Sequence, residues 1–233
     1  MKFRISIAVC GLLLAVSANA TQLFTNGGFE TNGGFGSATF SSWLTGGTAG
    51  SDDDFYADNG FTTTINGFST VGPFAGSWYA VTDDSGLVSP EESYIVQSVT
   101  IPVGFDISFS GEMFVNDQFG SSGSGAEIAI WAAGANPLTT APLYVIQAFV
   151  DTGETGGAAN PYVLYSQDIT AQVTAGTTYE IGVLEEDATG PINVGVDSFS
   201  LVATPEPATL LPTALLGAGI LLYSLRRKVR AQV

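Results

Sequence analysis

The chain has 233 residues, of which 22 are acidic, six are basic and none is histidine, and its formal net charge at pH 7 is −16. All six basic residues lie before position 5 or after position 225, so the long middle of the chain carries only negative side-chain charge. These absences exclude nucleic acid as a partner and remove the bases and cationic groups of serine hydrolases, Schiff-base enzymes and phosphoryl transferases.

The first twenty residues have the layout of a secretory signal. Two basic residues precede an apolar run over residues 5–16, and the small residues Ala18 and Ala20 stand at the two positions that a signal peptidase reads. The apolar run is too short to span a bilayer. We therefore predict a signal peptide over residues 1–20, removed by signal peptidase after Ala20, and the only cysteine, Cys10, leaves with it.

The body, residues 21–203, reads as an all-β chain. Clusters of Gly, Ser, Thr, Asn and Asp interrupt short runs rich in Val, Ile, Tyr and Phe, and no helical pattern is present. Eight runs are predicted to be strands: residues 78–82, 93–101, 105–115, 126–132, 143–150, 162–169, 178–184 and 194–202. Eight strands are enough for two sheets, so we predict one β-sandwich domain over residues 21–203, arranged as a jelly roll because doubled sheets limit exposed edges.

Several acidic runs interrupt the strand pattern. Residues 52–60 read Asp-Asp-Asp-Phe-Tyr-Ala-Asp-Asn-Gly, whose oxygen-bearing side chains are spaced like a calcium loop but lack the closing bidentate acid of an EF-hand. A solvated turn is the preferred interpretation. The acidic runs at residues 83–84, 91–92 and 185–187 are likewise predicted to be solvent-facing loop ends.

Two motifs at the ends of the body resemble the galactose-binding-like and carbohydrate-binding jelly rolls. Residues 26–30 read Asn-Gly-Gly-Phe-Glu and are followed by Phe40 and Trp43, as in the opening of those modules. Residues 194–201 resemble their closing strand, and residues 95–99 resemble the strand before a Pro-Gly turn. The resemblance implies that the terminal strands pair. Aromatic rings of such modules stack on sugars, and the candidates here are Trp43 and Tyr56, although core packing is the more common fate of such residues.

Asp197 is the candidate metal ligand of the closing strand. On a period of two it shares a face with Phe199 and Leu201, so its carboxylate is predicted to point inward. The body has no Lys or Arg to pair with it, so either backbone and hydroxyl donors satisfy the carboxylate or a metal does. Pairing of the terminal strands would bring Glu30 beside it, and the resemblance implies a structural Ca²⁺ held by Glu30 and Asp197. Both interpretations stay open.

The C-terminal end contains a potential membrane span. Residues 208–225 carry no charge and, at ~1.5 Å per residue, are long enough to cross a bilayer as one transmembrane helix. The basic cluster that follows at residues 226–230 favours the cytoplasmic side, which leaves the body outside. Its members are Arg226, Arg227, Lys228 and Arg230.

Residues 204–230 resemble the PEP-CTERM sorting signal. This resemblance rests on a Pro-Glu-Pro tripeptide, an apolar helix and a terminal arginine cluster in that order. The tripeptide is formed by Pro205, Glu206 and Pro207. In that family an exosortase recognises the tail, and the members belong to bacteria that make exopolysaccharide.

Together these features predict a protein exported from a Gram-negative-type bacterium, held briefly in the inner membrane and then placed at the cell surface or in the extracellular matrix. We expect a non-enzymatic structural or glycan-binding component of the envelope, with signal peptidase, exosortase and exopolysaccharide as partners. One alternative is a carboxylate-pair glycan hydrolase, with Glu112 and Glu127 on neighbouring strands as candidates. Another is a surface protein whose copies assemble through calcium bound between acidic faces.

Overall fold

The computed structural model describes residues 19–48, 54–60, 71–83, 91–117, 124–150, 160–187 and 192–206. Residues Thr21–Thr204 form one compact unit. The predicted transmembrane helix, residues 208–225, and all but the last two residues of the predicted signal peptide lie outside the described residues. Within the described ranges, no helix is long and apolar enough to cross a membrane.

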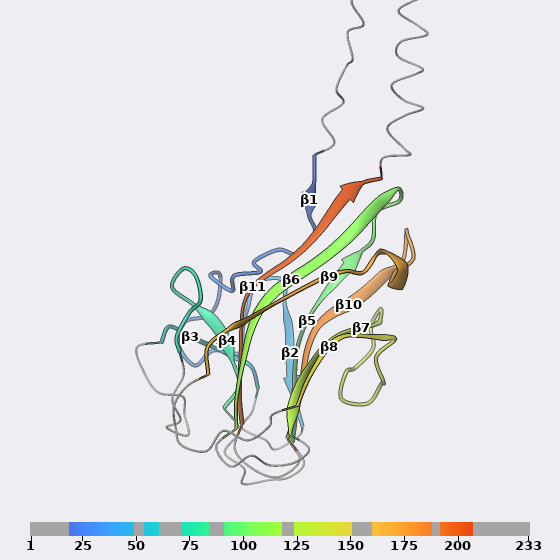
Figure 1. Ribbon diagram of the computed structural model, residues 1–233. Coiled ribbons are helices and arrows are strands. Elements are labelled where there is room, and N and C mark those ends of the chain that lie inside the picture. The colour runs from blue at the N-terminus through green and yellow to red at the C-terminus, as the bar shows by residue number, and fades with distance from the viewer. Residues whose placement is uncertain are drawn as a thin grey trace, which may run out of the picture. The chain divides into compact units, whose positions relative to one another are not determined.

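The body is a β-sandwich of two antiparallel sheets (Figure 1). The first sheet has the order β3 (Tyr56–Asp58), β4 (Tyr79–Val81), β11 (Ile192–Pro205), β6 (Phe105–Asp117) and β9 (Val163–Asp168), and β1 (Thr21–Gln22) also pairs with β11. The second has the order β2 (Leu44–Gly47), β5 (Glu91–Thr100), β10 (Thr178–Asp187), β7 (Gly125–Ala132) and β8 (Tyr144–Val150). A short 3₁₀ turn, η1 (Thr170–Gln172), follows β9. The predicted all-β class and two-sheet sandwich are confirmed, and each of the eight predicted runs contains a strand.

The hydrophobic core lies between the two sheets and follows the alternation of the strands. In the second sheet, Ile95 of β5 stands opposite Val183 of β10, and both side chains are fully buried in this core. In the first sheet, Phe109 packs edge to face against Phe199 with ring centroids 5.3 Å apart. Burial of large apolar and aromatic side chains from both layers holds the sheets together.

The two ends of the body meet in the first sheet. Thr21 of β1 pairs with Ala203 of β11, and the Phe199 N–H donates to the carbonyl of Gly27 at 2.8 Å. A Cβ atom on Gly27 would lie 1.8 Å from the Phe199 carbonyl oxygen, so only glycine permits this approach. The prediction that the opening and closing motifs pair is confirmed.

The alternation of β11 slips by one residue in the middle of the strand. Val194 and Val196 point into the core, but the next core residue is Phe199, because Ser198 takes a left-handed conformation with φ +54°. Asp197 therefore does not share a face with Phe199. The prediction that it points into the core is wrong, and its carboxylate lies on the other side of the first sheet.

Candidate functional site

Asp197 is fully buried although it lies on the outer side of β11. Its Oδ2 accepts a hydrogen bond from the Ala75 amide at 2.9 Å, and its Oδ1 accepts one from the Ser198 amide at 2.5 Å. Burial raises the pKa of Asp197 to about 6, and the negative charge of Glu30 adds to this, while the amide donors act in the opposite direction. The segment of residues 74–78 thus covers this carboxylate. Ionisation of the carboxyl group stays unfavourable in spite of the amide hydrogen bonds.

Glu30 binds the C-terminal end of the same segment, residues 74–78. Its Oε1 accepts hydrogen bonds from the amides of Ser77 at 2.8 Å and Trp78 at 3.1 Å. A Cβ atom on Gly76, whose φ is +71°, would lie 2.0 Å from this oxygen, so the carboxylate fits only against glycine. Backbone amides therefore partner both Glu30 and Asp197.

The backbone of Gly28 runs beside both carboxylates. A Cβ atom placed on Gly28 would lie 3.8 Å from Asp197 Oδ1 and 3.9 Å from Glu30 Cγ. Two carboxylates with nearby backbone oxygens match the ligand preference of Ca²⁺ in type. In the described part of the chain, however, no group of three or more His, Cys, Asp or Glu residues is suited to hold a metal. Backbone carbonyls or water would have to complete a calcium shell here.

An aromatic cluster covers the outer face of the first sheet. We call it the outer aromatic cluster, and it consists of Tyr56, Tyr79, Val81, Phe114 and Tyr162. Phe114 lies at its centre, with its ring centroid 5.0 Å from that of Tyr162 and 6.1 Å from that of Tyr79. A Cβ atom on Gly195 of β11 would lie 2.0 Å from the Phe114 ring, so this glycine makes the room that the ring occupies.

The outer aromatic cluster reaches solvent through Phe74. This ring is 52% exposed and packs edge to face against Tyr162 with centroids 5.5 Å apart. The Tyr162 hydroxyl is buried and has no hydrogen-bond partner among the described residues. Burial raises the pKa of Tyr162 well above its usual range, and the nearby charges of Asp197 and Asp58 raise it further.

Asp58 supplies a buried carboxylate to the same face. It has no exposed surface, and its Oδ2 accepts a hydrogen bond from the Tyr79 hydroxyl at 3.1 Å. Its Oδ1 accepts from the Gly60 amide at 2.8 Å. The interpretation of residues 52–60 as a solvated turn is therefore wrong at Asp58, because residues 56–58 form a strand that packs under other parts of the chain.

The two rings predicted to stack on a sugar have packing roles. Trp43 is 7% exposed, and its indole N–H donates to the carbonyls of Thr25 at 3.1 Å and Asn26 at 3.0 Å. Tyr56 is 3% exposed and belongs to the outer aromatic cluster. Neither ring offers an open face, whereas the ring of Phe74, which lies in a turn that carries no strand pattern, is exposed.

Three further acidic side chains predicted to face solvent are buried. Asp83 is 2% exposed, and Glu91 and Glu185 have no exposed surface. The prediction failed because Glu91 begins β5 and Glu185 lies inside β10, so strand alternation turns both toward the other sheet. Their neighbour Glu186 is exposed, as predicted.

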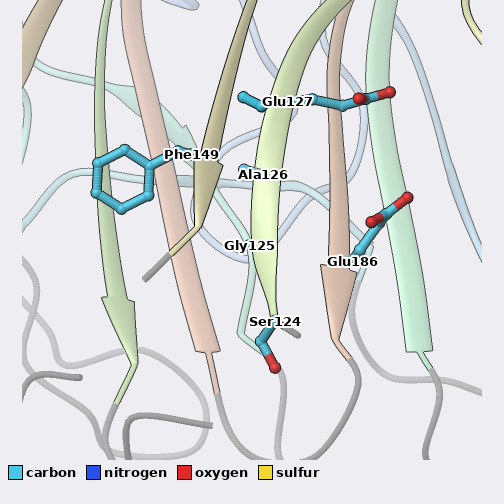
Figure 2. Close-up of a pocket in the computed structure, with 7 residues that line it drawn as sticks. Ser124, Gly125, Ala126, Glu127, Phe149 and Glu186 are labelled. Carbon is cyan, nitrogen blue, oxygen red and sulfur yellow. The ribbon is translucent and has the colours of Figure 1, made fainter. Parts of the chain in front are cut away.

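A small pocket lies on the outer face of the second sheet (Figure 2). Glu127 of β7 and Glu186 of β10 line it and extend to the same side in the view, and burial together with the charge of Glu186 raises the pKa of Glu127. Glu112 lies in β6 of the first sheet, where its neighbour Met113 faces the core. Glu112 and Glu127 therefore lie on opposite outer faces of the sandwich, which removes them as a pair of catalytic acids.

Comparison with known proteins identifies no family for this chain. No protein-family model matches the chain, and no curated protein matches it in sequence. Among solved structures, the chain is similar to the carbohydrate-binding module TmCBM61 in complex with β-1,4-galactotriose, at 16% identity and a TM-score of 0.47, over 78% of this chain and 97% of that one. It is also similar to the Stig cyclase Fisc from Fischerella sp. TAU, at 12% identity and a TM-score of 0.49, over 81% and 100% of the two chains.

A third similar structure is the cleaved adhesin domain of Lys-gingipain from Porphyromonas gingivalis, at 16% identity and a TM-score of 0.46, over 70% of this chain and 91% of that one. At these identities the likeness concerns the fold alone. The set of similar structures also corrects the expectation that the chain is not an enzyme. The similar structures include cyclases, which are enzymes.

Proposed function

We propose that this protein is an exported jelly-roll sandwich that binds glycan at the outer face of its first sheet. The observation that carries the proposal is the half-exposed ring of Phe74, which packs on the partly buried Tyr162 at the margin of the outer aromatic cluster. A flat ring with one open side offers the apolar face of a pyranose a stacking surface. The solved complex of a carbohydrate-binding module with galactotriose is compatible with this role.

Polar groups beside this ring are of the kind that recognise sugar hydroxyls. The buried Tyr162 hydroxyl has no partner among the described residues, so a small side-chain movement would let it bond to a ligand. Glu112 is 8% exposed, and its charge raises the pKa of Tyr162. Carboxylates accept hydrogen bonds from sugar hydroxyls, and the acidic surface favours a neutral glycan over an anionic one.

The glycan proposal is tested by affinity gel electrophoresis with the host's own exopolysaccharide in the gel. The full chain should be retarded, and Phe74→Ala should lose most of the retardation because the stacking surface is removed. Leu143→Ala is the matched control, since Leu143 is a 62% exposed apolar side chain that precedes β8 in the other sheet. Equal retardation of the two variants would exclude Phe74 as the sugar contact.

We further propose the route by which the protein reaches this glycan. Signal peptidase removes residues 1–20, the helix at residues 208–225 holds the chain in the inner membrane, and an exosortase processes the tail near Pro-Glu-Pro. The protein then reaches the cell surface or the exopolysaccharide matrix. Intact-mass measurement of surface-extracted protein tests both steps, and a mass equal to that of the full 233-residue chain would refute them.

The last part of the proposal is a structural Ca²⁺ held by Glu30 and Asp197. The raised pKa of Asp197 supports it, because a cation beside this buried carboxylate would relieve the cost of its ionisation. Chelation should then lower the melting temperature of the wild type. Asp197→Asn should weaken that response because this site then loses a carboxylate ligand, and a melt insensitive to chelation would leave the backbone amides as the partners of the two carboxylates.

A further inference from the structure

Glu91 is the least satisfied charged side chain among the described residues. It has no exposed surface at the start of β5, and both of its carboxylate oxygens are buried without a hydrogen-bond partner. Buried polar atoms in folded proteins are nearly always partnered, and an unpartnered carboxylate is the most costly exception. This side chain therefore requires a partner that the described residues do not supply.

A second buried carboxylate lies on the same face of the second sheet. Glu185 of β10 stands directly opposite Ser93 of β5, and the Ser93 hydroxyl donates to Glu185 Oε2 at 2.8 Å. Glu91 is two residues before Ser93 on the same strand, so it shares this core-facing side, as does Ile95 two residues later. The diagonal between such positions on paired strands is about 7–8 Å between Cα atoms, which two glutamate side chains can bridge through one bound atom.

The chemistry of the surroundings limits what this partner can be. No Lys, Arg or His exists between residues 5 and 225, so the body offers no cationic side chain. A single proton shared by the two carboxylates would still leave one buried negative charge. Water would provide donors but no charge, and two buried carboxylates would still repel each other. A divalent cation balances both charges and takes carboxylate and hydroxyl oxygens as ligands.

We propose that Glu91 and Glu185, with the hydroxyl oxygen of Ser93, bind a divalent metal ion, with Ca²⁺ as the best match, between the two sheets. This site uses β5 and β10 of the second sheet, whereas Glu30 and Asp197 belong to the first sheet and the loops beside it. The two sites are independent. The ion joins neighbouring strands at the end of the sandwich where β5 begins, and it allows an acid-only body to bury two carboxylates.

The number of Ca²⁺ ions bound per chain tests the proposal. The full chain is dialysed against Ca²⁺, and bound metal is measured by mass spectrometry for the wild type, Glu91→Gln and Glu185→Gln. Each variant should hold one ion fewer than the wild type. Glu92→Gln is the matched control, because Glu92 is the next residue on the same strand and lies on the opposite face, and it should hold the wild-type number.

Glu30→Gln separates this site from the one in the proposed function. Glu30→Gln should still bind the ion that Glu91→Gln loses, whether or not Glu30 itself binds calcium. If Glu91→Gln and Glu185→Gln bind as much Ca²⁺ as the wild type, the proposal is overturned. Greater stability of both variants in chelator, without a change in bound metal, would identify a shared proton instead.

A variant that retains both carboxylates controls for the possibility that the two glutamine variants lose metal because they misfold. Ser93→Ala removes the hydroxyl that orients Glu185, and it should weaken binding of this one ion by about tenfold or more. Folding of each variant is checked by circular dichroism before titration. An unchanged Ca²⁺ titration of folded Ser93→Ala would overturn the proposal.

Discussion

The raised pKa of Asp197 predicts that this residue makes the protein less stable as the pH rises. Its pKa in the folded chain is about 6, against an ordinary value of about 3.9 for aspartate. The folded state therefore binds the proton more tightly than the unfolded state does. The stabilising contribution is fully present below about pH 4 and is lost as the pH rises through about 6.

The magnitude follows from the size of this shift. A difference of about two pKa units corresponds to about 3 kcal/mol, at about 1.4 kcal/mol for each unit. The side chain is fully buried, so solvent screening does not reduce this figure greatly. Asparagine at position 197 does not titrate. The free energy of unfolding of the wild type, relative to that of Asp197→Asn, should therefore fall by about 3 kcal/mol between about pH 4 and pH 7.

The assay is urea unfolding of both chains across this pH range with a chelator present, so that no divalent ion compensates the charge. Asp168→Asn provides a control of opposite sign. Hydrogen bonds from the amide and side chain of Thr170 lower the pKa of the exposed Asp168, so the wild type should lose stability relative to this variant as the pH falls. If the difference in unfolding free energy between the wild type and Asp197→Asn does not change with pH, then Asp197 is not a buried carboxylate whose ionisation destabilises the fold.

Three further predictions concern packing and buried hydrogen bonds, and each is measured by urea unfolding. Gly195→Ala should cost about 1–3 kcal/mol, because the new methyl group would lie 2.0 Å from the Phe114 ring. Gln97→Leu should cost about 1–2 kcal/mol, since the Gln97 amide pairs with both the N–H and the carbonyl of Thr25 at 2.8 Å. Trp43→Phe should cost about 1–3 kcal/mol by removing an indole donor to two main-chain carbonyls, and costs near zero would show that water replaces it.

The longer strands could be predicted from the sequence because most of them bury one face along six or more residues. Residues 105–110 alternate apolar and polar side chains, and β6 begins at the expected residue and continues to Asp117. The strands β1, β2 and β3 were missed because they have only two to four residues and carry no periodic signal. Their pairing is decided by the longer strands beside them.

The candidate sites were less predictable, because they depend on which segments cover the outer faces. The pairing of the terminal strands was predicted from the two end motifs, and it brought Glu30 near Asp197. The face of Asp197 was predicted wrongly because Ser198 adopts φ +54°, a conformation that is uncommon for serine and has no sequence signal. Glu91 was predicted wrongly because composition indicates that acidic runs are solvated, whereas tertiary packing decides their burial. Phe74 had no signal in the sequence, because it lies outside every predicted strand.

An acid-only body can fold if neutral dipoles replace the missing cations, and several of its carboxylates use this solution. Four backbone amides hold Glu30 and Asp197. A tyrosine hydroxyl holds Asp58, and a serine hydroxyl holds Glu185. Dipoles stabilise a carboxylate without cancelling its charge, so each added acid raises the cost of the others. Among the described residues no group donates a hydrogen bond to Glu91, and the dependence of folding on a bound cation should therefore be greatest at that residue.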